Sequence, residues 1–371
     1  MFGIRQADRR AHLYVIGKTG TGKSTLLETM IRQDIGAGQG VALLDPHGDL
    51  VERVLTWLPG SRRSDLVYFN VPDRDRPLGF NPLERVPPAK RALAASGMLE
   101  VFKKLWVDSW GPRLEHLLRN TLLALLDQPE ATLADIPRLL DESDYRRVVV
   151  ERTANAQVRR FWLREYAAYP VRFRAEVIAP LHNKVGAFLA DPLLNAILTQ
   201  PKSNFDLRAV MDEGRVLLVN LAKGKIGGDS AALLGALLVS RIGLTALSRV
   251  EVPEKSRRDF FVYLDEFPTF TTVSLATMLS ELRKYHVSLV LAHQYLSQVD
   301  LQVRDAILGN VGTIVSFRLG LADAEVLEKE FHPEFDADDL VNLPNHSIYL
   351  KLMMNGVVSR PFSAETLAPF G

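Results

Sequence analysis

Two parts of the chain alternate short apolar runs with segments that carry apolar residues at helical spacing, one near the start and one from about residue 201 onward. The runs that we expect to form buried strands are Leu13–Ile16, Val41–Leu44, Leu66–Asn70, Arg215–Leu221, Phe260–Leu264, Val287–His293 and Thr313–Leu319. Near the end, Ser347–Met353 and Val357–Pro361 flank Asn355-Gly356, which predicts a closing hairpin. Repeated strand–helix units predict an α/β fold with a mostly parallel sheet that is covered on both faces.

The strand pattern stops between about residues 83 and 200, and helical patterns replace it. The expected helical stretches are separated by proline and short polar turns, and they are Pro88–Trp106, Pro112–Asp127, Leu133–Leu140, Asp144–Tyr169 and Phe173–Leu189. We therefore expect residues 83–200 to form an all-helical domain that is inserted into one α/β domain made of residues 1–82 and 201–371.

The turn after the first strand fits the pattern G-x-x-x-x-G-K-[ST] from Gly17 to Ser24. A strand precedes it and a helix, Ser24–Ile35, follows, so unpaired backbone N–H groups at the helix start can hold phosphates. Lys23 would reach the β- and γ-phosphates of ATP, and the Ser24 hydroxyl would be a ligand of Mg²⁺. The residues that we expect to bind the nucleotide are Gly17, Thr19, Gly20, Thr21, Gly22, Lys23, Ser24 and Thr25. The pattern predicts a P-loop NTPase.

Polar residues follow two later strands, at the sheet edge where ligands bind in such folds. Asp265 and Glu266 come directly after a buried strand, as in a Walker B motif, so Asp265 is expected to hold Mg²⁺ and Glu266 to activate water. Gln294 ends the next strand and is expected to position the γ-phosphate or the attacking water. Acids that end a strand by chance, or an ordinary turn amide, are the structural alternatives.

Arginine is the residue type that supplies a positive charge to the γ-phosphate across subunit interfaces. Arg283, one helix before the strand that ends at His293, is the first candidate, and Arg318 is the second. From spacing alone, a solvated helix end is an equally good interpretation of Arg283. His47 and His293 lack the spacing of metal ligands.

The charge distribution adds two candidate contact regions for nucleic acid, although the net charge is only +1. The segment 145–174 holds eight arginines and two acidic residues, interleaved with aromatic residues. It predicts either contact with DNA or an acidic partner, or an amphipathic helix with solvated arginines, and the second interpretation is favoured. The loop that contains Lys223 and Lys225 is expected either to touch a nucleic-acid backbone or simply to turn the chain.

Composition excludes disulfides and thiolate metal sites, because cysteine is absent. We find no apolar run long enough to span a bilayer and no signal peptide, so we expect a cytoplasmic protein.

Taken together, the motifs resemble the motor domain of conjugative coupling proteins, the TraG/TraD family of type IV secretion within the FtsK–HerA superfamily. The segments that carry this resemblance are His12–Thr25, Asp45–Asp49, Phe80–Leu83, Asn220–Lys225, Leu264–Phe267 and Arg283–Gln294.

The resemblance implies a RecA-like ATPase that forms a homo-hexameric ring and drives DNA, single-stranded in conjugation, through a central channel. It implies that the helical insertion faces the relaxosome and DNA, and that secretion-channel proteins are partners. It also implies that Arg283 is the arginine that acts in trans, and it places the motor at the cytoplasmic face of the inner membrane. Family members usually carry N-terminal transmembrane helices, so any membrane link would use segments absent from this chain or a partner.

Alternatives stay open at this point. A secretion ATPase that acts on protein substrates and a HerA-like DNA-processing ATPase belong to the same superfamily. A small-molecule kinase with a helical lid and a non-hydrolysing nucleotide switch belong to other classes, and Glu266 beside Asp265 argues against both.

Overall fold

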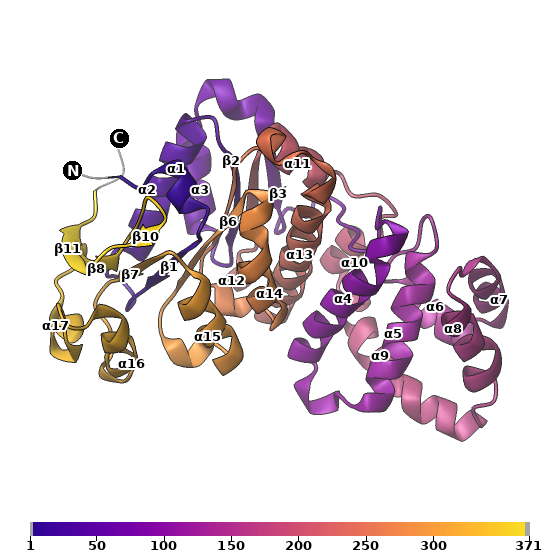
Figure 1. The fold of residues 1–371 in the computed structure, drawn as a ribbon. Helices are drawn as coiled ribbons and strands as arrows, with labels where there is room; N and C mark the ends of the chain where they lie inside the picture. Colours follow the sequence, from indigo (N-terminus) through magenta and orange to yellow (C-terminus); the bar gives the residue numbers. More distant parts are fainter. Residues whose placement is uncertain (1–2, 368–371) are drawn as a thin grey trace. The chain divides into compact units, whose positions relative to one another are not determined.

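The computed structural model describes residues 3–367 and divides the chain into two compact units (Figure 1). The first, here called the sheet unit, comprises Met1–Phe69, Leu207–Gly224 and Thr245–Gly371. The second, the helical unit, comprises Asn70–Asp206 and Lys225–Leu244. The division of function between a motor part (1–82 with 201–371) and an inserted domain (83–200) stays a prediction.

A nine-stranded sheet in the order β11-β8-β7-β1-β6-β5-β2-β4-β3 organises the sheet unit. Its strands include all seven that the apolar runs predict: β1 (Leu13–Ile16), β2 (Gly40–Asp45), β3 (Leu66–Asn70), β4 (Val216–Asn220), β5 (Phe260–Leu264), β6 (Val287–His293) and β7 (Thr313–Ser316). Six of them, from β7 to β4 in the sheet order, run parallel, so their carboxyl ends meet at one edge. The expected α/β fold with a mostly parallel sheet is confirmed.

The six parallel strands are buried on both faces, which explains why they read as continuous apolar runs. On one face, side chains such as Val15 and Leu43 pack against Leu27 and Ile31 of α2 (Lys23–Gly36) in one core. The side chains that alternate with them, such as Leu44, are also fully buried. The remaining helices of more than one turn in the sheet unit are α3 (Asp49–Trp57), α11 (Leu207–Glu213), α14 (Ser274–Glu281), α15 (Leu301–Asn310), α16 (Leu321–Phe331) and α17 (Ala337–Asn342).

The predicted closing hairpin is wrong in its main pairing. Asn355 and Gly356 do form a turn with positive φ, but it joins only β9 (Met353–Met354) to β10 (Val357–Val358). The longer strand β8 (Ser347–Lys351) instead pairs antiparallel with β11 (Phe362–Glu365) and with β7. The Asn355-Gly356 turn reverses the chain locally, but β8 pairs with the free edge of β7 and so becomes part of the large sheet.

Residues 83–200, all of which the structure describes, contain helices and no strand, as the sequence predicts. The α-helices are α4 (Arg91–Leu105), α5 (Pro112–Leu126), α6 (Asp135–Asp141), α7 (Ser143–Arg152), α8 (Ala156–Arg160), α9 (Val171–Ala190) and α10 (Pro192–Leu198). The long helix expected over Asp144–Tyr169 is broken. The chain leaves helical geometry after Arg152, and the Asn155 side chain caps α8 by accepting from the backbone N–H groups of Gln157 and Val158.

One helix in the described part of the chain, Gly228–Glu251, is long and apolar enough to cross a membrane by length and composition. The expectation that no stretch reaches this length is therefore wrong. However, 67% of its most apolar window is buried inside the protein, which is the usual environment of a core helix in a soluble protein.

Candidate nucleotide site

The P-loop connects β1 to α2 at the carboxyl edge of the sheet. Gly20 and Gly22 have φ values of 78° and 118°, which residues with a Cβ adopt only with strain. A Cβ on Gly22 would also lie 2.8 Å from Nδ1 of His346. The buried Thr21 hydroxyl donates to the Lys18 carbonyl over 2.8 Å and fixes the shape of the loop. The loop therefore presents the start of α2 to a ligand.

Lys23 is the charged centre of this loop and is 6% exposed. Its Nζ donates to the carbonyls of Gly17 and Lys18 at 2.6 and 3.0 Å. Burial lowers the pKa of Lys23, and the carboxylates of Glu266 and Asp265 act against this shift. A phosphate would give the ammonium a stronger acceptor than these carbonyls.

A hydrogen-bond chain joins the three sequence motifs. The Thr19 hydroxyl donates to Oε1 of Gln294 over 2.8 Å, and Nε2 of Gln294 donates to Oε1 of Glu266 over 2.7 Å. Glu266 has a left-handed backbone, with φ and ψ of 47°, at the point where the chain leaves β5. The sequence prediction that these residues gather at one sheet edge is confirmed by this geometry, whereas their roles stay predictions.

Asp265 is buried beside two other acidic residues. Burial, together with the nearby carboxylates of Asp45 and Glu266, raises the pKa of Asp265 to about 7, and Lys23 acts in the opposite direction. Asp45 itself ends β2 and accepts from the backbone N–H groups of His47 and Leu50, which anchors the start of α3. This crowding of negative charge is what a divalent cation relieves.

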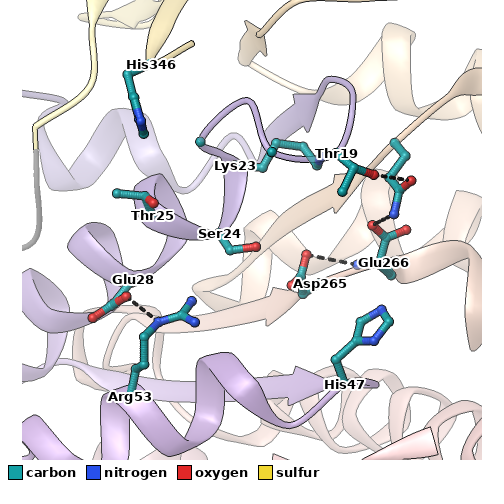
Figure 2. A pocket seen from close by; sticks show the side chains of 13 residues that line it. Thr19, Lys23, Ser24, Thr25, Glu28, His47, Arg53, Asp265, Glu266 and His346 are labelled. Carbon is teal, nitrogen blue, oxygen red and sulfur yellow. Dashed lines mark hydrogen bonds and ion pairs between the residues drawn. The ribbon is translucent and has the colours of Figure 1, made fainter. Parts of the chain in front are cut away.

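These elements line a pocket of about 540 Å³ (Figure 2). Its lining includes most of the predicted nucleotide-binding and catalytic residues, which are Thr19, Gly20, Gly22, Lys23, Ser24, Thr25, Asp265, Glu266 and Gln294. Gly17 and Thr21 do not line the pocket. The carbonyl of Gly17 accepts from Lys23, and the side chain of Thr21 is fully buried.

Four further lining residues were not predicted as site residues: Glu28, His47, Arg53 and His346. Glu28 and Arg53 form an ion pair of 2.7 Å between α2 and α3. The His346 N–H donates to the Thr21 carbonyl over 2.8 Å, although His346 is more than 300 positions away in sequence. Two sequence signals pointed to this group: Glu28 lies one helical turn after Thr25, and His47 lies in the segment Asp45–Asp49 that follows the second strand.

The two candidate arginines lie outside this pocket. Arg283 is exposed in the short helix Leu282–Tyr285, which leads into the start of β6, whereas the P-loop follows the end of the parallel neighbour β1. Arg283 therefore lies at the amino ends of the parallel strands, whereas the P-loop of the same chain lies at their carboxyl ends. Arg318 donates to the Leu343 carbonyl and to Oδ1 of Asn345, and so holds the loop that carries His346.

One of the two candidate nucleic-acid regions differs from expectation, whereas the other fits the favoured interpretation of solvated arginines. Lys223 and Lys225 lie in a short helix, α12 (Lys223–Ile226), and not in an open loop. In the segment 145–174, Phe161, Trp162 and Tyr166 are buried, at 4%, 3% and 1% exposure, so they are unavailable for stacking on bases. The exposed arginines of this segment are Arg147, Arg152, Arg159, Arg160, Arg164 and Arg172.

Comparison with known proteins identifies the family. The family model of the type IV secretion-system coupling protein DNA-binding domain matches residues 3–328. The chain belongs to this family. The resemblance inferred from its motifs is confirmed at this level. No curated protein sequence matches the chain.

Solved structures share the fold at low sequence identity. The plasmid coupling protein TrwB in complex with the non-hydrolysable ATP analogue ADPNP has a TM-score of 0.67 and 18% identity, over 98% of this chain and 88% of that chain. TrwB in complex with ADP and Mg²⁺ has a TM-score of 0.65 and 20% identity, over 97% and 86%. VirB4 of Thermoanaerobacter pseudethanolicus has a TM-score of 0.63 and 15% identity, over 96% and 90%. The expected P-loop NTPase fold is confirmed.

Proposed function

We propose that this coupling-protein family member is an ATP-driven motor that moves DNA during type IV secretion. In this proposal the chain forms a ring, most simply a homo-hexamer, and hydrolyses ATP at the interfaces between subunits. Family membership supports the proposal, as do the complexes of TrwB with ADPNP and with ADP and Mg²⁺.

The observation that carries the proposal is the hydrogen-bond chain from Thr19 through Gln294 to Glu266. It fixes a carboxylate and an amide beside the P-loop, where the γ-phosphate of a bound ATP and the attacking water would lie. Gln294 would orient that water and Glu266 would accept its proton, while Lys23 would offset negative charge on the phosphates.

The residues present fit a magnesium ion. The Ser24 hydroxyl and the Asp265 carboxylate are the oxygen ligands that Mg²⁺ prefers, and both line the pocket. Burial, together with the carboxylates of Asp45 and Glu266, raises the pKa of Asp265, and a cation would offset the negative charge crowded there. Bound there, Mg²⁺ would supply charge neutralisation at the β- and γ-phosphates.

The position of Arg283 supports its role in a ring. Because it lies at the sheet edge away from its own P-loop, it is suited to the site of a neighbouring subunit and not to its own. We include this trans role in the proposal, with the catalytic assignments of Lys23, Glu266 and Gln294.

The proposed partners follow from the family. DNA, in single-stranded form, is the proposed cargo, and residues 83–200 are proposed as the inserted domain that faces DNA and the relaxosome. Secretion-channel proteins would be further partners. We place the protein in the cytoplasm at the inner face of the membrane, linked to it through another segment or a partner.

DNA-stimulated ATP hydrolysis by the purified chain tests this proposal. Phosphate release should be slow without DNA and rise on addition of single-stranded DNA, and Glu266→Gln should abolish both rates. DNA-independent hydrolysis that an unfolded protein substrate stimulates would instead favour a secretion ATPase that acts on proteins. Phosphate transfer to a small molecule would favour a kinase, and nucleotide binding without turnover would favour a switch.

A further inference from the structure

Arg53 is a cation in the nucleotide pocket that belongs to none of the nucleotide-binding motifs. It lies on α3 and lines the pocket together with Ser24, Thr25 and Glu28 (Figure 2). Its side chain is 44% exposed, so a ligand can reach it. The inference drawn from it rests on the proposed function, because it concerns the nucleotide that the pocket would hold.

A buried carboxylate holds Arg53 in place. Glu28 is 4% exposed, and its Oε2 accepts from Nε of Arg53 over 2.7 Å. The other oxygen, Oε1, accepts from Arg32 over 2.6 Å. The arginine is therefore fixed through its Nε, and among the described residues the structure gives its two terminal nitrogens no hydrogen-bond partner. These nitrogens are the donors that bind phosphate oxygens in pairs.

The local charge balance favours an anion at this position. The carboxylate of Glu28 is shared by two arginines, Arg32 and Arg53, so its single negative charge does not serve Arg53 alone. Arg32 has a 14% exposed side chain and lies over the Trp57 ring, at 5.2 Å from its centroid. Of the two arginines, Arg53 is the more exposed and is the one that lines the pocket, so it presents positive charge to a ligand there.

The position of Arg53 along the pocket indicates which part of the nucleotide it meets. Lys23, Glu266 and Gln294 mark the end for the γ-phosphate. Figure 2 shows Glu28 and Arg53 on the side of Ser24 that faces away from Thr19 and Glu266. The geometry points to Arg53 as a residue that contacts the α- or β-phosphate of the nucleotide, supplied by the same chain that supplies the P-loop.

Equilibrium binding of ADP and of ADPNP to the full chain tests this inference. Arg53→Gln should weaken the binding of both nucleotides by about tenfold, which is typical for loss of a charge-assisted hydrogen bond at a partly exposed site. Arg53→Lys should recover part of the loss, because a point charge replaces the fork of the guanidinium. The matched control is Arg63→Gln, an exposed arginine of the same unit outside the pocket, which should bind like the parent.

Three results would overturn the inference. Unchanged affinity in Arg53→Gln would show that no contact exists. Loss confined to ADPNP would place Arg53 at the γ-phosphate instead. A lower melting temperature of the nucleotide-free protein, with no recovery of affinity in Arg53→Lys, would show that the Glu28–Arg53 pair only holds α2 to α3. If the parent chain binds neither nucleotide, the proposed function fails as well, which separates that outcome from the other three.

Discussion

The sheet unit and the helical unit use their charged residues in different ways. In the sheet unit, Lys23 and Asp265 are both 6% exposed and lie in one pocket at the carboxyl edge of the parallel strands. In the helical unit, arginines such as Arg159 and Arg160 lie on the surface, while the aromatic residues beside them form the core. Buried charges such as Lys23 and Asp265 lower the stability of the fold unless a ligand or a reaction uses them, whereas the arginines of the helical unit form an ordinary solvated surface.

Part of this contrast holds for histidine, since three of the six in the sheet unit are buried, whereas neither of the two in the helical unit is. In the sheet unit, His12 and His293 are 1% and 0% exposed, and burial lowers the pKa of His12 to about 4 and that of His293 to about 3. In the helical unit, His116 and His182 lie near the surface beside carboxylates of Glu165 and Asp141. Burial of polar groups, more than their number, therefore distinguishes the sheet unit, which holds the candidate nucleotide site, from the helical unit.

The largest effect should come from Glu266→Gln. If this carboxylate accepts the proton of the attacking water, hydrolysis should fall by about a thousandfold while ATP binding is kept. Lys23→Ala should instead lose binding, because the phosphates lose their main cation. Phosphate release and nucleotide binding, measured on the same preparations, distinguish the two variants. Glu254→Gln, an exposed acid, is the control. Parent-like hydrolysis in Glu266→Gln would remove the water-activating role from this residue.

A smaller effect should appear when two inactive variants are mixed. Arg283→Ala and Lys23→Ala chains should each be inactive, yet mixed rings contain interfaces with one intact P-loop and one intact arginine. Part of the parent turnover should therefore return on mixing. The measurement is ATPase rate against mixing ratio, in rings that are shown to exchange subunits. If no ratio restores turnover, the arginine that acts in trans is a different one.

Most of the sheet unit could be predicted from the sequence, because burial of the strands determines both the apolar pattern of the sequence and the position of the strands in the sheet. Strands that are buried on both faces must be apolar throughout, so β1 and β5 are visible as runs such as Leu13–Ile16 and Phe260–Leu264. Parallel strands bring their ends together, which is why Glu266 and Gln294 could be expected near the P-loop.

The remaining parts depend on contacts between residues that are far apart in sequence. Arg53 enters the pocket because buried Glu28 anchors it, and His346 enters because its N–H binds Thr21. The pairing of β8 with β11 depends on which strand edge is free after the sheet has formed. These contacts and this strand pairing cannot be read from the spacing of hydrophobic residues or of motifs along the sequence.

Acid should destabilise the sheet unit through its buried histidines. The folded-state pKa of His12, about 4, lies below its usual value, so the unfolded chain binds the proton more readily between pH 6.5 and pH 4. Stability is then present above pH 6.5 and is lost as the pH falls toward 4, by about 3 kcal/mol for this residue. Urea unfolding at pH 7 and pH 4 should show this loss in the parent and in His116→Gln, but a smaller loss in His12→Gln. Equal losses in all three proteins would contradict the assignment.

The smallest effect concerns the exposed arginines of the helical unit. Arg159 and Arg160 lie on α8, next to the buried Trp162, and their charges face solvent. If they contact DNA phosphates, Arg159→Gln with Arg160→Gln should weaken DNA binding several-fold and make its salt dependence shallower by about 1.4 in the log–log slope, since each single-strand phosphate contact contributes about 0.7. No change in base preference is expected, because the neighbouring aromatic rings are buried.

The control variant loses the same two positive charges as the Arg159/Arg160 variant, but from the surface of the sheet unit. Arg63 and Arg360 are exposed in the sheet unit, so their double replacement by Gln removes the same two charges. If only the Arg159/Arg160 variant changes the salt slope, the helical unit contacts DNA. If both variants change it equally, the protein responds to net charge and neither surface is a specific contact. An unchanged slope in both would mean that these arginines are a solvated helix face, and DNA would then have to be held by other residues.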